Sequence, residues 1–299
     1  MSMFVLSKKW LVLTSFVIFL GALGLLLVFY FSPTQALKQL EITFFNVGQG
    51  DSVLIQTPYQ QNIIIDGGPD NSLIQKLGRT LPFYDRTIDL IIITHPQSDH
   101  FFGFIDVLER YKVERIITAD IPYETEDWKA FVLLAQQKNI PTHFVSSERS
   151  ITLGEDLFLT FLWPQEQFIN TQTLKDANEG SVVAELVYKD QKYLFAGEIT
   201  QEIEKRLIEK NLFHDIDVLK VAHHGSKTST SKEFIHSTTP EVAIIMAGKE
   251  NRFGHPNFRT LKTLQDSNIP TFRTDIHGDI TITSDGARYS TVPQFSGGL

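Results

Sequence analysis

The order of short apolar runs constrains the fold of this 299-residue chain more than any other sequence feature. Strand-like runs rich in β-branched residues come first, units of strand and helix follow, and the same order then repeats. Two packed sheets with helices on their outer faces satisfy this order, because each sheet must bury its apolar faces against another layer. The order therefore predicts an α/β (α+β) fold with two similar halves in one domain.

Three consecutive strands open the first half. Leu40–Phe45, Ser52–Gln56 and Asn62–Ile65 are separated only by turn residues, which predicts a meander. Leu90–Ile93 is an uninterrupted apolar run, as expected for a strand that is buried on both faces. Further strands are predicted at Arg115–Thr118, Ile151–Leu153, Leu157–Trp163, Val182–Tyr188, Lys192–Phe195, Asp217–Val221, Val242–Met246, Thr271–Thr274 and Asp279–Thr283. Helices are predicted at Phe104–Arg110, Glu126–Lys138, Ile203–Leu212 and Arg259–Ser267.

The N-terminal segment carries a membrane signal, because the 22 residues from Trp10 to Phe31 include no charge and follow Lys8 and Lys9. A helix of that length rises about 33 Å and can span the hydrocarbon core. The alternative is a cleaved signal peptide, although its apolar core is normally only about 7–15 residues long. The two lysines predict a cytoplasmic N-terminus and an extracytoplasmic domain. We predict a single-pass anchor at residues 1–35, a globular domain at 36–290 and a flexible tail at 291–299.

The composition limits which chemistry and partners are possible. The formal net charge is -8, and an acidic surface repels nucleic acid and anionic lipid at long range. Extensive non-specific DNA binding is therefore not expected, although a local basic strip remains compatible with this charge. The sequence contains no cysteine, so disulfides and thiolate metal sites are excluded. Any metal must be held by histidine, aspartate, glutamate or neutral oxygen ligands.

Three potential metal ligands follow a buried strand directly. His95, Asp99 and His100 lie in a turn that comes after Leu90–Ile93, and Pro96 ends that strand. A compact turn can direct all three side chains at one point, which favours a metal site. The alternative is a helix-capping aspartate accompanied by two incidental histidines.

A second cluster follows another predicted strand. His223 and His224 come directly after Asp217–Val221 and precede Gly225, which allows a tight turn, and Glu198 lies just past the strand before them. Paired histidines and single carboxylates at such positions can also be ordinary surface residues. Other polar residues at strand ends or turns are Asp51, Asp66, Asn178, Ser181, Asn251, His255 and Asp275, while His143, His214, His236 and His277 are predicted to be surface or packing residues.

Eight motifs in this order resemble the ComEC-type DNA-uptake branch of the metallo-β-lactamase superfamily. The resemblance covers residues from about 40 to 285 and depends on the order of the motifs rather than on any single one. It implies an αββα sandwich with metal at the joint edge of the two sheets. The transmembrane helix predicted from the N-terminal run would precede this sandwich in the chain. The matching stretches are 46–52 (NVGQGDS), 65–68 (IDGG), 94–100 (THPQSDH), 178–181 (NEGS), 194–198 (LFAGE), 219–226 (LKVAHHGS), 251–256 (NRFGHP) and 273–275 (RTD) followed by Gly278.

The resemblance also implies a cofactor and a set of site residues. The cofactor is a divalent metal, zinc or manganese, present as one or two ions. The implied ligands are His95, Asp99, His100, Glu198 and either His223 or His224. Asp99 is expected to accept the proton of the attacking water, and His255 to assist at a phosphate oxygen. The expected substrate-binding residues are Ser226, Lys227 and Asn251, whereas Asp66 and Asn178 are expected to orient the ligands.

Two residues depart from the family's metal site. Gln97 stands where the family usually has His or Asp, and an uncharged amide is a weak zinc ligand. Glu198 stands where the family has Asp, and its extra methylene moves the carboxylate. Both changes are expected to weaken the ion on the His95 side most, because Asp99 and His100 remain for the other ion.

Three hypotheses follow for the function. The first is a metal-dependent phosphodiesterase or nuclease that serves DNA uptake outside the cytoplasmic membrane. The second is a mononuclear or altered-metal enzyme that acts on another phosphoester or on an envelope substrate. The third is a binding or scaffold module without catalysis, since this fold hosts many functions. The expected partners are the membrane through the N-terminal helix, DNA or another phosphodiester, and a separate channel protein, because a single span forms no channel.

Overall fold

The structure is a computed structural model that describes residues 8–30, 39–146, 148–165 and 177–296. The chain divides into two compact units between Lys38 and Gln39, and the first unit contains the helix α1 (Lys8–Tyr30). Among the described residues, no helix is long and apolar enough to cross a membrane, so the predicted anchor is not confirmed. Residues 1–7 and 31–35 of that predicted segment lie outside the described residues, as do residues 297–299 of the predicted tail.

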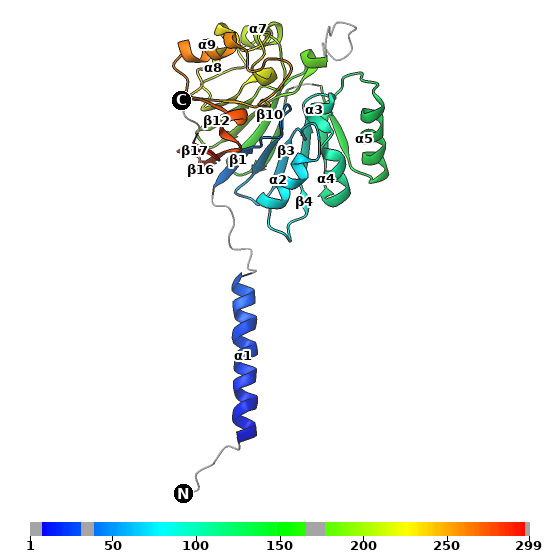
Figure 1. Cartoon of the computed structure of the whole chain (residues 1–299), viewed down its shortest axis with the longest axis vertical. Helices are drawn as coiled ribbons and strands as arrows, with labels where there is room; N and C mark the ends of the chain where they lie inside the picture. Colours follow the sequence, from blue (N-terminus) through cyan, green and yellow to red (C-terminus); the bar gives the residue numbers. More distant parts are fainter. Residues whose placement is uncertain (1–7, 31–38, 147, 166–176, 297–299) are drawn as a thin grey trace. The chain divides into compact units, whose positions relative to one another are not determined.

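Two large β-sheets form the second unit (Figure 1). The first sheet has eight strands in the order β17 (Tyr289–Pro293), β16 (Ile280–Ser284), β1 (Leu40–Phe44), β2 (Val53–Gln56), β3 (Asn62–Ile65), β5 (Leu90–Ile93), β7 (Ile116–Ala119) and β8 (Thr142–Val145). The second sheet has seven strands in the order β15 (Thr271–Arg273), β14 (Val242–Ile245), β13 (Val218–Lys220), β12 (Gln191–Phe195), β11 (Val183–Tyr188), β10 (Leu157–Trp163) and β9 (Arg149–Gly154). A small third sheet pairs β4 (Thr87–Ile88) with β6 (Lys112–Val113).

Helices cover the outer faces of the two large sheets. Figure 1 shows α2, α4 and α5 on one side of the pair of sheets and α7, α8 and α9 on the other. The helices of this unit are α2 (Ser72–Thr80), α3 (Ser98–Phe101), α4 (Phe104–Arg110), α5 (Glu126–Gln137), α7 (Gln201–Glu209), α8 (Lys232–Thr238), α9 (Phe258–Asp266) and α10 (Thr274–His277), with the short 3-10 helices η1 (Ala177–Gly180) and η2 (Ala222–Gly225).

Three apolar layers hold the sandwich together. Leu90 and Ile92 of β5 belong to the layer between the two sheets, whereas Ile91 and Ile93 belong to the layer beneath α2, α4 and α5. The third layer, which includes Leu219 of β13, lies beneath α7, α8 and α9. Successive strand residues point to opposite faces, so an uninterrupted apolar run supplies both layers. The predicted αββα sandwich and the double burial of Leu90–Ile93 are confirmed.

The structure also contains α2, α8, β8 and β17, which the sequence patterns did not predict. The predicted meander of β1, β2 and β3 is confirmed by antiparallel pairing. α2 buries only Leu73 and Leu77, and β17 alternates half-buried and exposed residues. β17 is an edge strand held by its pairing with β16 rather than by an apolar run of its own. It extends the sheet through residues 291–293, which corrects the expected start of the tail.

Parallel strands bring the polar segments of the chain to one edge. β3, β5 and β7 run parallel in the first sheet, and β12, β13, β14 and β15 run parallel in the second. The carboxyl ends of parallel strands meet at the same edge of a sheet, where ligands commonly bind. The turns after β5, β12 and β13 carry most of the predicted metal ligands, so the topology places them together.

Candidate metal centre

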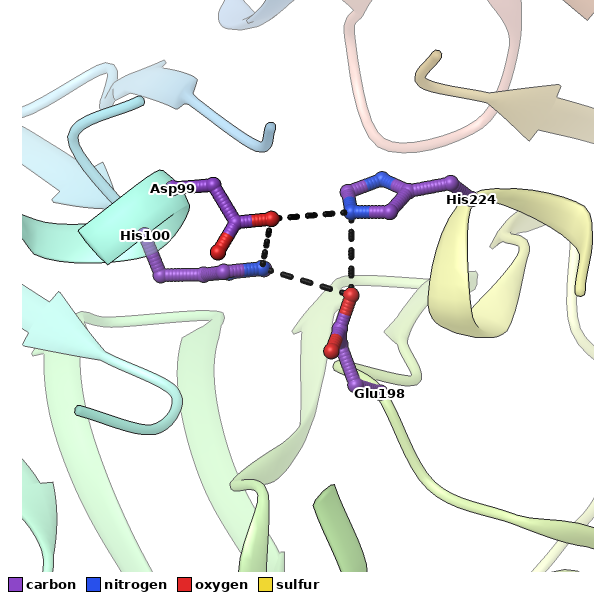
Figure 2. Close-up of side chains that lie close together, drawn as sticks. All are labelled: Asp99, His100, Glu198 and His224. Atoms are coloured by element: carbon purple, nitrogen blue, oxygen red, sulfur yellow. Dashed lines mark ion pairs between the residues drawn. The ribbon is translucent and has the colours of Figure 1, made fainter. Parts of the chain in front are cut away.

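Four side chains from the two halves of the sandwich converge at this edge. Asp99 and His100 belong to α3, Glu198 follows β12, and His224 lies in η2. Figure 2 shows all four pointing toward one small volume, and one ligand atom of each lies within 4.8 Å of the others. We call Asp99, His100, His224 and Oε1 of Glu198 the first position.

The first position has the geometry of a cation site. Oε1 of Glu198 lies 2.9 Å from Nε2 of His224 and 3.3 Å from Nε2 of His100. Oδ2 of Asp99 lies 3.6 Å and 3.8 Å from the same two nitrogens. Glu198 and the two histidines are buried, whereas the Asp99 side chain is 30% exposed. Asp99 therefore forms the open side of the first position.

Hydrogen bonds on the far side of each imidazole turn its Nε2 atom toward the site. Nδ1 of His224 lies 2.9 Å from the carbonyl oxygen of Met246, which can only accept, so this nitrogen donates. Nδ1 of His100 lies 2.8 Å from Oδ2 of Asp66 and donates to that carboxylate. Both Nε2 atoms lack a well-directed hydrogen bond among the described residues. A divalent cation bound by two imidazoles and two carboxylates fits this arrangement.

A second group faces the other oxygen of Glu198. Its Oε2 lies 3.2 Å from Nε2 of His95 and 3.9 Å from Nε2 of His223. Oε1 of Gln97 also lies 3.2 Å from the same His95 nitrogen. We call His95, Gln97, His223 and Oε2 of Glu198 the second position. Glu198 thus stands between two groups of ligands, and it is the only acidic residue of the second position.

The Thr94 hydroxyl defines how His95 is oriented. Oγ1 of Thr94 donates to Oδ2 of Asp66 at 2.8 Å, so its one proton is already used. The same oxygen lies 3.1 Å from Nδ1 of His95 and accepts from that nitrogen. Nε2 of His95 is therefore the ring atom available to a ligand, and it faces oxygens of Glu198 and Gln97. Asp66 thus supports histidines of both positions, directly at His100 and through Thr94 at His95.

Histidines and carboxylates compensate one another's charge at the two positions. Burial by itself raises the pKa of Glu198, but His100 and His95 outweigh it and hold this pKa well below its usual range. Burial by itself lowers the pKa of His100 and of His224, but the surrounding carboxylates raise both pKa values well above the usual range. Metal binding would therefore release protons from these imidazoles.

The other predicted site residues surround this centre. The ring centroid of His255 lies 5.6 Å from that of His223. Burial, together with His224 and His223, lowers the pKa of His255 to about 4, so this imidazole is neutral at pH 7. Lys227 is exposed in the turn after η2, and Asn178 is buried in η1.

Two predicted substrate-binding residues are engaged within their own loops. Oδ1 of Asn251 accepts from the backbone N–H of His255, and Nδ2 donates to the carbonyl oxygens of Gly248 and His255. Ser226 is buried, and its hydroxyl lies 3.0 Å from that of Thr228. These contacts make Asn251 a clamp on the loop that carries His255.

Two buried charged residues at the centre were not among the predicted ligands or supports. Lys220, at the end of β13, is only 2% exposed, and its ammonium contacts Oδ2 of Asp51. Oδ1 of Asp51 lies 3.3 Å from Nδ1 of His224. Burial by itself raises the pKa of Asp51, but the Lys220 ammonium and His224 lower it below its usual range. The available signal was a lysine inside an apolar run, because a buried lysine requires a partner.

The fold and this centre define the class of protein. The chain matches the metallo-β-lactamase superfamily over residues 45–249 and belongs to that superfamily. CmlA, a diiron β-hydroxylase from Streptomyces venezuelae, superimposes with a TM-score of 0.52 over 80% of this chain and 53% of that chain. Its sequence is 14% identical, so this likeness shows the fold alone.

The curated relatives connect the chain with competence proteins, as the sequence resemblance predicted. ComE operon protein 3 of Bacillus subtilis (strain 168) is 30% identical over 260 residues, which cover 80% of this chain and 32% of that protein. Competence protein ComA of Neisseria gonorrhoeae is 26% identical over 249 residues, which cover 81% of this chain and 32% of that protein. This chain therefore spans about a third of the length of these relatives.

Proposed function

We propose that this chain is a metal-dependent phosphodiesterase of the nuclease type that serves DNA uptake outside the cytoplasmic membrane. The observation that carries the proposal is the first position. There, ligand atoms of two imidazoles and two carboxylates lie close enough together to hold one cation. Zinc or manganese suits such a ligand set, which contains no thiolate. One ion is expected at the first position, and a more weakly held ion at the second position.

Three residues of the centre have separate roles in the proposed hydrolysis. A divalent ion at such a centre supplies Lewis-acid polarisation of a phosphoryl oxygen and a water nucleophile at neutral pH. Asp99 lies on the open side, so its carboxylate is placed to accept the proton of the attacking water. His255 is neutral at pH 7 and can donate a hydrogen bond to a phosphate oxygen. Glu198 presents one carboxylate oxygen to each of the two positions.

The rim beside His255 supports nucleic acid as the substrate. Phe253 and Phe258 are 55% and 76% exposed. The guanidinium of Arg252 lies 5.1 Å from the ring centroid of Phe253, and Nη1 of Arg259 donates to the carbonyl oxygen of exposed Lys227. Exposed aromatic rings interleaved with cations are typical of surfaces that stack bases and pair with phosphates. The chain as a whole has a net charge of -8, so the grouping of Lys227, Arg252 and Arg259 beside these rings favours binding of a nucleic-acid strand at this place.

The location of the activity is part of the same proposal. The uncharged run at residues 10–31 supports a single-pass anchor. Lys8 and Lys9 before it support a cytoplasmic N-terminus, which would hold the domain outside the membrane. The relative from Neisseria gonorrhoeae is named a competence protein, which supports a role in DNA uptake. A separate channel protein is the proposed partner that moves DNA across the membrane.

Hydrolysis of two substrates tests the proposal. The purified full chain with Mn²⁺ or Zn²⁺ is expected to hydrolyse bis(p-nitrophenyl) phosphate and to cleave a fluorescein-labelled oligothymidylate. The double change Phe253→Ala and Phe258→Ala should lower kcat/KM for the oligonucleotide by about 5- to 100-fold, because stacking of bases is lost. Hydrolysis of the small ester should not change, since it carries no base.

A matched control separates the rim from general effects of removing an exposed ring. Phe144→Ala removes a phenyl group that is 55% exposed on β8, and both activities should stay at the wild-type level. Equal loss of oligonucleotide cleavage in both variants would contradict the role of the rim. A wild-type chain that binds neither Zn²⁺ nor Mn²⁺ in excess would contradict the enzyme and favour a scaffold.

A binding or scaffold module is the second candidate, and Gln97 is the residue that favours it. Gln97→His is expected to raise the zinc content from about one ion per chain to about two, because an imidazole replaces a weak amide ligand at the second position. Metal analysis after dialysis, together with hydrolysis of the small ester, measures the effect. Gln97→Ala is the control and should keep one ion. Two tightly bound ions in the unaltered chain would contradict the prediction that the second position binds zinc weakly.

A further inference from the structure

A buried lysine lies directly behind the candidate metal centre. Among the described residues, Lys220 is the only buried lysine or arginine. Its ammonium contacts Oδ2 of Asp51, and the carbonyl oxygens of Gly197 and Val221 lie 3.4 Å and 3.3 Å away. Burying a charge is costly unless it is paired and hydrogen-bonded, so these three oxygens are what keeps the ammonium in place.

Asp51 links this lysine to a ligand of the first position. One carboxylate oxygen contacts Lys220, and the other lies 3.3 Å from Nδ1 of His224. Asp51 comes from the connection between β1 and β2, whereas Lys220 and His224 belong to the opposite sheet and the turn that follows it. The Lys220–Asp51 ion pair therefore joins the two halves of the sandwich beside the first position. At this position His224 of the second half lies close to Asp99 and His100 of the first half.

The local backbone does not by itself hold His224 in place. His223 and His224 both have φ near 50°, in the left-handed region that non-glycine residues seldom occupy. Such a conformation persists only where surrounding contacts determine it. For His224 these contacts are the carbonyl oxygen of Met246 at 2.9 Å and the carboxylate of Asp51, both on the Nδ1 side of the ring.

We propose that Lys220 and Asp51 act together as positioning residues that hold His224 with its Nε2 atom directed into the first position. Lys220 orients the Asp51 carboxylate, and Asp51 in turn supports the far edge of the imidazole. This inference rests on the metal-binding part of the proposed function. It assigns a role in metal affinity to two residues that themselves coordinate nothing, as groups that orient a ligating histidine commonly do.

Metal titration of neutral variants of the full chain tests the proposal. Lys220→Met keeps most of the side-chain length without the charge, and Asp51→Asn keeps the shape of the carboxylate. Each is expected to weaken Zn²⁺ and Mn²⁺ binding by about 10- to 100-fold in isothermal titration calorimetry. The double variant should bind metal no more weakly than the worse single variant, because the two residues act as one unit.

Thermal unfolding without metal separates positioning from a purely structural role. A structural role alone would lower the unfolding midpoint while the folded variants bind metal with wild-type affinity, and that result would overturn the proposal. Lys76→Met is the matched control, because Lys76 forms a 2.7 Å ion pair with Asp279 away from the metal ligands. It should leave metal affinity unchanged.

The variants also distinguish this proposal from the proposed function. If Lys220→Met does not fold, Asp51→Asn carries the same test, and wild-type affinity in that variant would overturn the proposal. A chain that binds metal but hydrolyses no phosphodiester would refute the proposed function, while weaker metal binding by both variants would still support positioning. A wild-type chain that binds no divalent metal would overturn both.

Discussion

Replacing Glu198 with alanine is expected to abolish tight divalent-metal binding at both positions and hydrolysis with it. One oxygen of Glu198 faces His100 and His224, and the other faces His95 and His223. Among the described residues, no other carboxylate faces histidines of both positions with its two oxygens. The loss of affinity should exceed the roughly 100-fold that follows from altering a group that only supports a ligand.

Calorimetric titration with Zn²⁺ and Mn²⁺, followed by metal analysis after dialysis, measures this loss. Glu204→Ala is a matched control because Glu204 is also a buried glutamate of the same half. Its carboxylate accepts from the backbone N–H groups of Thr230 and Ser231, away from the metal ligands. That variant should lose stability but keep wild-type metal affinity. Retention of tight binding by Glu198→Ala would show that the two positions do not share this carboxylate.

Replacing Gly103 with alanine is expected to destabilise the fold by about 3 kcal/mol and to weaken metal binding, because the added methyl group overpacks a closed site. A Cβ atom there would lie 2.0 Å from the carbonyl oxygen of Gly67 and 2.7 Å from that of Asp70. Both obstacles are backbone atoms and cannot rotate away. Gly103 connects α3 to α4, so any displacement would move the helix that carries Asp99 and His100.

Urea unfolding of the full chain and a metal titration test this result together. Gly78→Ala is the control, since no atom outside its own helix α2 lies within 4 Å of a Cβ atom at that position. It should stabilise the chain by roughly 0.5–1 kcal/mol through the helix propensity of alanine. A Gly103→Ala chain with the wild-type unfolding midpoint and metal affinity would show that the α3–α4 connection adapts without cost.

The elements with strong local patterns could be predicted from the sequence. Leu90–Ile93 was predicted with the bounds that the structure shows, because an uninterrupted apolar run suits a strand buried on both faces. The same holds for Leu157–Trp163, whose run of apolar and aromatic residues is long. By contrast, β17 has no apolar run of its own and depends on its pairing with β16. α2 was missed although it is amphipathic, because it is short and buries only Leu73 and Leu77.

The candidate ligands were found for a related reason. His95, Asp99, His100, Glu198 and His224 all follow strands, and strand ends can be located from apolar runs. Their convergence depends on the parallel arrangement of strands, which the repeated order of strands and helices indicates. Which histidines face which oxygen of Glu198 could not be predicted, because this depends on differences of a few ångströms in where the side chains lie.

The sequence alone determined the sandwich, the strands that end at the edge where the candidate metal centre lies, and the residue types that gather at this edge. Only the tertiary structure decided that His224 joins the first position while His223 faces the second, and that Asp51 and Lys220 support His224. The physical reason is distance along the chain. A local pattern reports how a residue is buried, whereas its partner across two sheets depends on how the whole sandwich closes.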